Sequence, residues 1–295
     1  MKIEIVTGFA CNNFCKFCSV GKRDFNKTTE VIKGEIDEAA AEKPEELNFT
    51  GGEPTIRKDI VELVSYAGGK FKNIRVTTNG RMLSYQDFAN RLVDAGMTGA
   101  IFSIHSHKAE VHNYLTSVDG CFGQAMRGME NLSELSGNIG INTVINLLNY
   151  RNLKDLARML FRFDIKSLCF IYPTVYGNLL DNMRLLPRYS EVSKHVVEAV
   201  ELVTSHGVMC WAMNIPACFL PGNENLSSLT KMRTKMYWPD VRADLDVKKY
   251  EDKVKPLQCD SCTVREVCPG IPKEYHELFG GGEVRPVRKR IELEY

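Results

Sequence analysis

The chain has 295 residues, of which 44% are hydrophobic and 25% are charged, and its formal net charge is +1. This composition is typical of a globular protein with a sizeable core, and the balanced charge provides no global field that would favour nucleic acid or an acidic surface. Because no apolar run approaches the roughly 18 residues of a membrane span, and the N-terminus is too short and too charged for a signal peptide, we expect a cytoplasmic protein with no membrane or nucleic-acid partner.

Short β-like runs alternate with amphipathic stretches up to about residue 207. The predicted strands are residues 3–6, 46–50, 73–77, 99–103, 140–146 and 167–172. The predicted helices are residues 30–42, 59–66, 85–95, 122–135, 153–163 and 189–205. Such strict alternation predicts a parallel sheet covered by helices, and six units are two short of a complete eight-unit barrel. We therefore predict an α/β fold, a partial (β/α)6 TIM-like barrel, with a doubly wound open sheet as the alternative.

The chain changes character after residue 207. Residues 208–215 could form one more strand, but residues 223–255 are polar and charged, with Tyr237 and Trp238 embedded in them. Such a segment lacks the apolar periodicity for a core of its own and would fold better around a metal centre. We predict two domains, residues 1–207 and residues 208–295, of which the second is small, irregular and cysteine-rich.

Ten cysteines are distributed unevenly, and in a reducing compartment they are expected to bind metal or to catalyse. Cys11, Cys15 and Cys18 have C-x3-C-x2-C spacing in the segment after the first predicted strand, which we call the cysteine loop (residues 7–18). Three thiolates on one tight loop can hold three irons of a cubane cluster and leave the fourth iron open. Structural zinc is the alternative, but zinc takes four protein ligands and no fourth cysteine is near.

Conspicuous glycine and polar residues follow the other predicted strands. Because the carboxyl ends of parallel strands lie at one end of the sheet, one polar pocket would collect these residues. They are Gly51-Gly52-Glu53-Pro54, Thr78-Asn79, Ser103, His105, Asn142 and Tyr176-Gly177-Asn178. Two further histidines in the loop after the fourth strand, His107 and His112, are expected to be solvated.

Cys11-x3-Cys15-x-Phe17-Cys18, followed by Gly51-Gly52-Glu53-Pro54, resembles the radical S-adenosylmethionine (SAM) enzymes over roughly residues 1–207. The resemblance implies a [4Fe–4S] cluster on the three cysteines, with SAM chelated to the open iron. It also implies a reducing partner such as flavodoxin or ferredoxin, and reductive cleavage of SAM to a 5′-deoxyadenosyl radical that abstracts a substrate hydrogen.

The same resemblance implies which residues bind SAM. The glycines would let the main chain approach its methionyl end, and Glu53 would accept from its ammonium group. The full implied set is Gly51, Gly52, Glu53, Pro54, Thr78, Asn79, Ser103, His105 and Asn142.

Cys259, Cys262 and Cys268 form a C-x2-C-x5-C pattern that resembles part of the SPASM and Twitch extensions of radical SAM enzymes. This implies one auxiliary [4Fe–4S] cluster and not two, since no cysteine follows Cys268. The fourth ligand must come from upstream, where Cys218 is favoured and Cys210 is the alternative. Four thiolates suit zinc equally well, so zinc is the alternative occupant of this cysteine group.

The resemblance implies an iron–sulfur oxidoreductase that oxidises, cross-links or epimerises a peptide or peptide-derived substrate. A dehydrogenation or rearrangement of a small metabolite is the alternative. A non-catalytic iron–sulfur electron carrier or redox sensor would not need Gly51–Pro54, and the C-terminal position of the extra cysteines disfavours a glycyl-radical activating enzyme. Residues 219–257 are expected to cover the open side of the barrel and to shape the substrate site.

Overall fold

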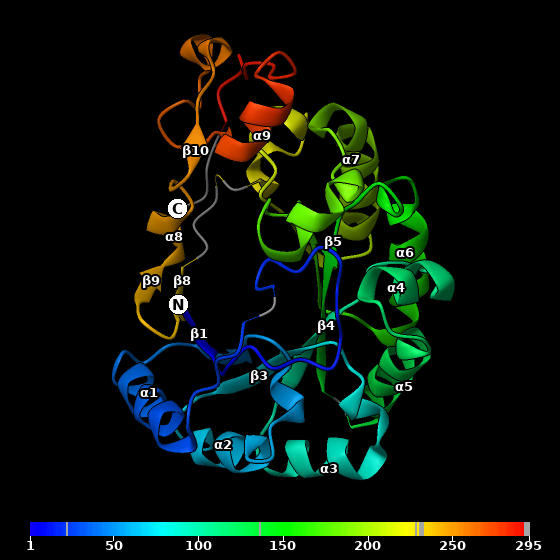
Figure 1. Ribbon diagram of the computed structural model, residues 1–295, viewed down its shortest axis with the longest axis vertical. Coiled ribbons are helices and arrows are strands. Elements are labelled where there is room, and N and C mark those ends of the chain that lie inside the picture. Colours follow the sequence, from blue (N-terminus) through cyan, green and yellow to red (C-terminus); the bar gives the residue numbers. More distant parts are fainter. Residues whose placement is uncertain (22, 136, 228, 230–232, 292–295) are drawn as a thin grey trace.

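The computed structural model describes residues 1–21, 23–135, 137–227, 229 and 233–291. Within these residues, nine strands form one curved sheet, and most of the helices lie along its outer side (Figure 1). The strands are β1 (Lys2–Val6), β2 (Glu46–Thr50), β3 (Asn73–Thr78), β4 (Gly99–Ser103), β5 (Asn138–Val144), β6 (Ser167–Ile171), β7 (Met209–Met213), β8 (Thr234–Tyr237) and β9 (Arg242–Asp244), with a separate pair β10 (Lys253–Val254) and β11 (Ile271–Pro272). The helices are α1 (Thr29–Ala41), α2 (Ile60–Ala67), α3 (Gln86–Asp94), α4 (Ala109–Thr116), α5 (Cys121–Glu134), α6 (Leu153–Leu160), α7 (Tyr189–Ser205), α8 (Leu245–Lys248) and α9 (Lys273–Phe279).

The order of the strands decides between the two predicted architectures. In the sheet, β1 to β7 follow one another in sequence order and all pair in parallel. A doubly wound sheet would reverse its strand order at a switch point, and this sheet has no reversal between β1 and β7. The predicted partial TIM-like barrel is therefore confirmed, and the run at residues 208–215 does form a strand, β7.

One predicted loop contains a helix. The polar stretch after β4 includes α4, which buries His112, Leu115 and Thr116. Because two of these three buried residues are polar, the stretch shows little apolar periodicity in the sequence. The prediction that His112 is solvated is wrong, since its side chain is buried.

Residues after 207 contribute strands to both sides of the sheet. β7 pairs with β6 at one edge, and β8 pairs in parallel with β1 on the other side and carries β9 as an antiparallel edge strand. Tyr237 is buried in β8, and the ring of Trp238 lies 6.4 Å from that of Phe9, just before the cysteine loop's first thiol. The boundary at residues 207/208 stays a prediction. Within the segment 219–257, residues 228 and 230–232 lie outside the described part of the chain.

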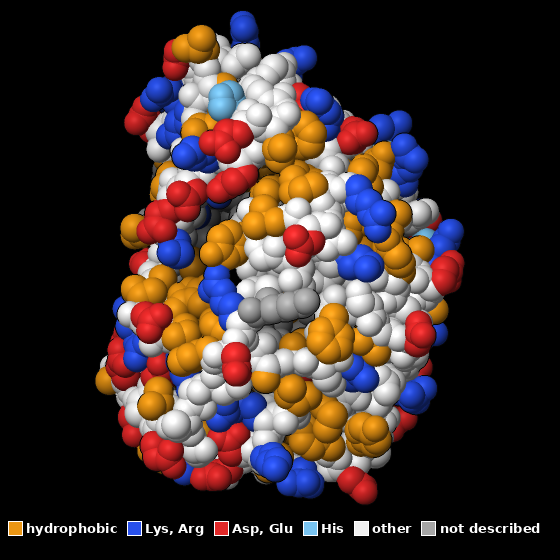
Figure 2. All heavy atoms as spheres, in the orientation of Figure 1, with side chains coloured by type: hydrophobic (Ala, Val, Ile, Leu, Met, Phe, Trp, Pro, Cys, Tyr) orange, Lys and Arg blue, Asp and Glu red, His pale blue; other side chains and the backbone are white. Residues whose placement is uncertain are grey.

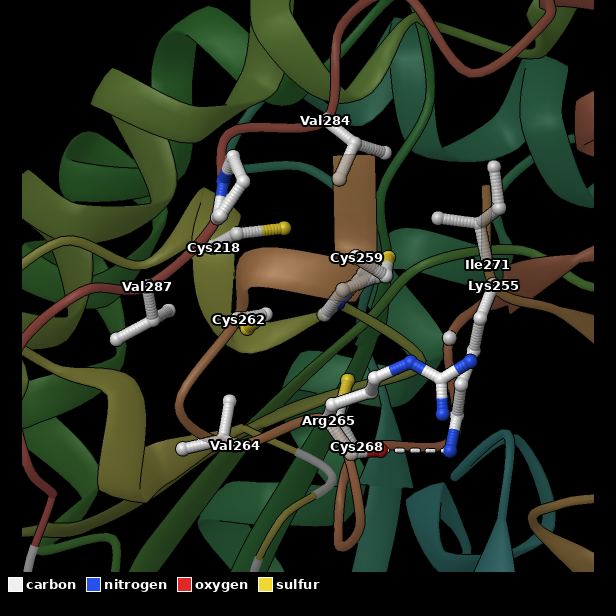
Figure 3. A pocket seen from close by; sticks show the side chains of 13 residues that line it. Cys218, Lys255, Cys259, Cys262, Val264, Arg265, Cys268, Ile271, Val284 and Val287 are labelled. Atoms are coloured by element: carbon white, nitrogen blue, oxygen red, sulfur yellow. Dashed lines mark hydrogen bonds between the residues drawn. The ribbon is translucent and has the colours of Figure 1, made fainter. Parts of the chain in front are cut away.

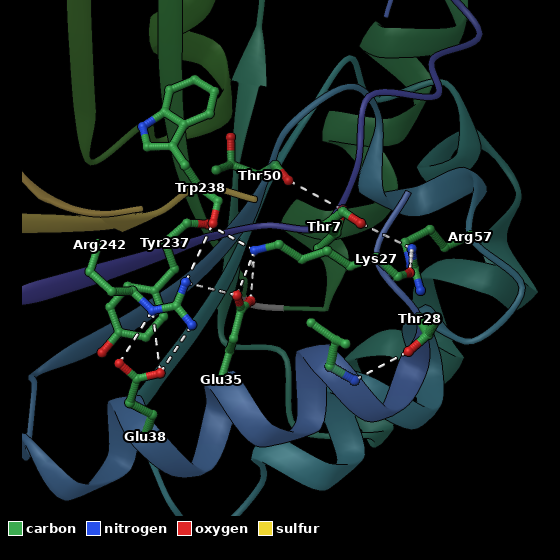
Figure 4. A network of polar contacts seen from close by, with 11 residues as sticks. Thr7, Lys27, Thr28, Glu35, Glu38, Thr50, Arg57, Tyr237, Trp238 and Arg242 are labelled. Carbon is green, nitrogen blue, oxygen red and sulfur yellow. Dashed lines mark hydrogen bonds and ion pairs between the residues drawn. The ribbon is translucent and has the colours of Figure 1, made fainter. Parts of the chain in front are cut away.

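A buried charge network joins β8 and β9 to α1 (Figure 4). The Lys27 ammonium donates to both oxygens of Glu35, at 2.7 and 2.8 Å, and to the carbonyl oxygen of Tyr237 at 3.0 Å. Arg242 lies 3.1 Å from Glu35 and also contacts Glu38. The side chains of Lys27 and Glu35 are only 1% and 4% exposed, so each charge depends on the other for compensation.

The surface mixes charges of both signs. On the face in Figure 2, acidic and basic side chains are interspersed between hydrophobic ones, in keeping with the net charge of +1. Among the described residues, no helix has the length and apolar character that a membrane crossing requires.

Lys27→Met is expected to lower the free energy of unfolding by about 3 kcal/mol, because it leaves the buried Glu35 carboxylate with Arg242 as its remaining charge partner. Lys33→Met is the matched control, since Lys33 and its partner Glu62 have side chains that are 31% and 57% exposed. The control should cost less than about 1 kcal/mol. Urea unfolding of both variants measures the difference, and equal losses would contradict a stabilising role for the buried pair.

Candidate active site

A cavity of about 540 Å³ lies at the carboxyl ends of the strands, and we call it the central cavity. Small-molecule sites are commonly about 300–1,000 Å³. Its walls include Cys11, Cys15 and Cys18, and all of the implied SAM-binding residues except Pro54: Gly51, Gly52, Glu53, Thr78, Asn79, Ser103, His105 and Asn142. Pro54 is buried at the start of a short 3-10 turn behind them.

The three thiols of the cysteine loop lie in a partly buried setting. Burial raises the pKa of Cys11 to about 11, and burial also raises the pKa of Cys15. The main-chain N–H of Asn13 donates to the sulfur of Cys11 at 3.4 Å. Thiolates in such a setting need positive charge beside them, which iron ions would provide.

Neighbouring segments hold the main chain of the cysteine loop. The N–H groups of Phe14 and Lys16 donate at 2.9 Å to the carbonyl oxygens of Thr116 and Leu115 at the end of α4. The helix that the sequence did not predict is therefore part of the support of the site.

Arg81 supports the same loop from the segment after β3. Its guanidinium donates to the carbonyl oxygen of Asn12 and, at 3.2 Å, to Oδ1 of Asn13, while Nε donates to Gln124 at 2.7 Å. Sequence reasoning did not select Arg81. The available signal was its position two residues after Asn79, in the loop that follows a predicted strand.

The two glycines after β2 pack against the start of the cysteine loop. A Cβ atom on Gly51 would lie 2.3 Å from the carbonyl oxygen of Gly8, and one on Gly52 would lie 2.2 Å from that of Ala10. The N–H groups of Gly52 and Glu53 donate to these same two oxygens, both at 2.8 Å. The absence of a side chain at both positions thus lets the two loops meet main chain to main chain.

The carboxylate of Glu53 is buried, with 2% of the residue exposed, and it is surrounded by donors. Oε1 accepts from the N–H and the hydroxyl of Thr55, at 3.1 and 2.5 Å, and from the hydroxyl of Thr78 at 2.7 Å. Oε2 accepts from the N–H of Asn79 at 2.6 Å. Burial raises the pKa of Glu53 in spite of these bonds.

Thr78 and Asn79 line the central cavity, but their side chains form hydrogen bonds with other residues of the protein. The hydroxyl of Thr78 is used by Glu53, and the side-chain amide of Asn79 donates to Oδ1 of Asn12 at 2.7 Å. These two residues therefore orient Glu53 and the cysteine loop.

Ser103 and Asn142 have polar groups to spare. They are paired neighbours on β4 and β5, and within the described part of the chain neither side chain has a hydrogen-bond partner. A ligand in the cavity can therefore bind to both.

His105 is a neutral imidazole in this structure. Burial places its pKa well below the usual value, and Nδ1 accepts from the N–H of Val144 at 3.2 Å. Its ring meets Phe17 edge-on at 4.6 Å and stacks on His112 at 5.6 Å, so the ring is fixed in the cavity wall.

The second group of cysteines surrounds a separate small pocket, which we call the auxiliary pocket (Figure 3). Cys218, Cys259, Cys262 and Cys268 all line it, whereas Cys210 is buried in β7 and does not. The rest of the lining is mostly apolar: Pro216, Val264, Gly270, Ile271, Val284, Pro286 and Val287, with Lys255 and Arg265 as the charged members. Burial raises the pKa of Cys218 to about 12.

No arrangement of three or more His, Cys, Asp or Glu side chains suited to a single metal ion occurs in residues 1–291 outside the gaps named above. What links each cysteine group to a metal or cluster is that its thiols line one cavity: Cys11, Cys15 and Cys18 line the central cavity, and the other four line the auxiliary pocket.

Known proteins place the chain in a family. Residues 5–163 match the model of the radical SAM superfamily. The chain is 31% identical to Fe-coproporphyrin III synthase of Methanosarcina barkeri over 171 residues, which are 57% of this chain and 42% of that protein. It is 32% identical to mycofactocin maturase MftC of Mycobacterium tuberculosis over 159 residues, which are 52% of this chain and 40% of that protein. Each match thus spans about two fifths of the relative.

A solved structure is similar over nearly the whole chain. SuiB of Streptococcus suis bound to S-adenosylmethionine matches with a TM-score of 0.70 and 14% identity, covering 97% of this chain and 76% of SuiB. SuiB bound to its precursor peptide SuiA matches with a TM-score of 0.60 and 14% identity, covering 72% of this chain and 48% of that chain. This likeness concerns the fold. Since the family model matches more than half of the residues, the chain belongs to the radical SAM superfamily of enzymes.

Proposed function

We propose that this enzyme uses a [4Fe–4S] cluster and SAM in the central cavity to modify a peptide or peptide-derived substrate, with a second cluster in the auxiliary pocket. The observation that carries the proposal is that Cys11, Cys15 and Cys18 line one cavity together with eight of the nine implied SAM-binding residues. These residues come from five different strand ends, so their meeting supports a common ligand.

Cys11, Cys15 and Cys18 would hold the cluster. Soft thiolates are the usual ligands of iron–sulfur clusters, and three of them leave one iron for another ligand. When bound, the cluster and SAM would supply one-electron reductive cleavage of SAM, with methionine as the leaving group, for removal of a hydrogen atom from the substrate.

Glu53 would bind the ammonium group of SAM. Its Oε1 already accepts three hydrogen bonds, whereas Oε2 accepts one and has acceptor capacity left. An ammonium group at Oε2 would favour the ionised carboxylate and oppose the effect of burial on its pKa. Ser103 and Asn142 would bind the ribose or carboxylate groups through their free polar atoms.

The substrate would meet the part of the cavity wall that these residues leave free. That part mixes apolar, amide and charged side chains of both signs: Phe14, Lys16, Arg23, Val144, Ile171, Asp181 and Asn182. A peptide offers main-chain amides and charged groups that suit such a wall. The apolar members would keep water away from a reactive intermediate.

The auxiliary pocket would hold its cluster on Cys218, Cys259, Cys262 and Cys268. Lys255 and Arg265, on the same pocket, would offset the negative charge of four thiolates. Such a centre can accept an electron from the substrate after hydrogen abstraction, or bind the substrate directly. Zinc is the competing occupant, because it takes the same four ligands.

A peptide substrate is supported by the similarity to a mycofactocin maturase and by a fold shared with SuiB, which has been solved with a precursor peptide. A second candidate is oxidative chemistry on a small metabolite, which the similarity to Fe-coproporphyrin III synthase favours.

Cys15→Ala should abolish formation of 5′-deoxyadenosine from SAM and dithionite, because the cluster would lose one of three ligands. Cys210→Ala is the matched control, since this thiol is buried in β7 and lines neither cavity. Chromatography of the anaerobic reaction measures the product. Undiminished 5′-deoxyadenosine from the Cys15 variant would sink the assignment of the cysteine loop.

Anaerobic reconstitution should give about eight irons per chain if both sites hold [4Fe–4S] clusters. Cys218→Ala should lower the iron content toward about four, because the auxiliary cluster would lose a ligand, while Cys210→Ala should leave it unchanged. Elemental analysis of the wild type and both variants measures iron and zinc per chain. About four irons with one zinc in the wild type would remove the proposed redox role of the auxiliary site.

The affinity for SAM should fall as the pH is lowered through the raised pKa of Glu53, because a neutral carboxyl cannot pair with an ammonium group. Glu53→Gln should weaken SAM binding roughly ten- to a hundred-fold at high pH and should flatten this pH dependence. Calorimetric titration of SAM at several pH values measures both effects. Glu62→Gln, on the exposed face of α2, is the control, and an unchanged pH profile in the Glu53 variant would show that another group titrates.

A further inference from the structure

The loop after β6 touches the cysteine loop main chain to main chain. The N–H of Asn178 donates to the carbonyl oxygen of Cys18 at 2.9 Å, and its side-chain Nδ2 donates to that of Cys15, also at 2.9 Å. One residue, at least 160 positions away in the sequence, thus binds the carbonyls of two of the three cysteines that would hold the cluster. No sulfur takes part in these bonds.

Gly177 makes this contact possible. Its φ is +60°, and a Cβ atom there would lie 2.4 Å from the carbonyl oxygen of Cys18 and 2.8 Å from that of Ser19. Both atoms belong to main chain, so neither can swing aside as a side chain would. A side chain at residue 177 would therefore push the two loops apart.

Asn178 is itself held in place. The amide of Asn182 donates to the carbonyl oxygen of Asn178 at 2.8 Å. On the other side, Arg23 donates to the hydroxyl of Tyr176 at 3.0 Å, which ties the region just after the cysteine loop to the same segment. Asn178 and Asn182 also line the central cavity, so the cavity wall and the cysteine loop form one hydrogen-bonded unit.

We infer that Asn178 is a positioning residue for the cluster of the cysteine loop, an inference that rests on the proposed function. Two carbonyls bound at fixed points set the peptide planes at Cys15 and Cys18, and these planes set the directions in which the two Cβ and sulfur atoms leave the main chain. Asn178 acts through the main chain and does not touch the cofactor's ligating atoms.

Substitutions of Asn178 can separate its side-chain hydrogen bond from its main-chain one. Every substitution at residue 178 except proline keeps the main-chain N–H that binds Cys18, so such a variant isolates the side-chain bond to Cys15. Alanine removes the donor. Aspartate keeps the shape but offers an oxygen where Nδ2 stands, and two acceptors 2.9 Å apart repel each other.

The experiment uses the full chain, reconstituted anaerobically, as wild type, Asn178→Ala and Asn178→Asp. The EPR signal of the reduced protein that changes when SAM is added reports on the cluster with the open iron, and iron release to EDTA gives its lifetime. We expect Asn178→Ala to lose the SAM-responsive cluster several-fold faster than wild type, with a weaker or altered signal. Asn178→Asp should be affected more strongly.

Asn73→Ala is the matched control, because it loses an equivalent side-chain bond, from Nδ2 to the carbonyl oxygen of Glu45 at 3.1 Å, at the start of β3 and therefore at the opposite end of that strand from the central cavity. It should match wild type in both measurements. Gly177→Ala gives a second test, since it displaces the loop while keeping both donors of Asn178. It should likewise weaken or alter the SAM-responsive EPR signal. Wild-type signals and release rates in both Asn178 variants would overturn the inference alone, whereas a wild type with no SAM-responsive signal would overturn the proposed function as well.

Discussion

The cysteine loop has no helix or strand of its own, so its main-chain polar groups must be bound by neighbours. A buried N–H or carbonyl without a partner costs free energy comparable to a lost hydrogen bond. Here the partners come from the loop after β2, the end of α4, the loop after β3 and the loop after β6. The position of three thiols therefore depends on four segments that are far apart in the sequence, and the order of the parallel strands brings those segments to one end of the sheet.

Glu53 is joined to the cysteine loop by hydrogen bonds of the same kind. Its N–H binds Ala10 at the start of the cysteine loop, while its carboxylate accepts from Thr78 and Asn79. Asn79 in turn binds Asn12, so a closed path of hydrogen bonds runs from the glutamate to the cysteine loop and back. A buried carboxylate is costly unless it is well bound, and four hydrogen bonds offset part of that cost. The charge that would recognise SAM and the loop that would hold the cluster are therefore fixed relative to each other before any ligand arrives.

The sequence predicts the parts of this site that depend on local pattern. The C-x3-C-x2-C spacing, the Gly51–Pro54 turn and the alternation of strands and helices are visible within short windows, and the structure brings their residues to one cavity. The sequence does not reveal α4, because its buried face is largely polar. Nor does it reveal the roles of Arg81 and Asn178, which depend on contacts across 68 or more residues. The sequence gives no signal for strand β8 either. Only the first and last of its four residues are buried, and it pairs with β1, which lies near the other end of the chain.

The C-terminal segment is held by several contacts of different kinds. Near its end, Tyr275 and Glu283 accept hydrogen bonds from the main-chain N–H groups of Tyr189 and Ser190 at the start of α7. At one end, β8 extends the sheet beside β1, and the charges of Lys27, Glu35 and Arg242 fix it there. At the other end, Cys218, Cys262 and Cys268 pack around a small cluster of four buried side chains: Ala217, Leu229, Val264 and Val287. Ile271, Tyr275 and Val284 join the core of the barrel, so the surrounding chain does not depend on these four side chains alone. A metal centre on the thiols would add stability to the part of the chain that carries them. The auxiliary pocket would then depend on its occupant for part of its stability, whereas the hairpin of β8 and β9, held by the core sheet, would not.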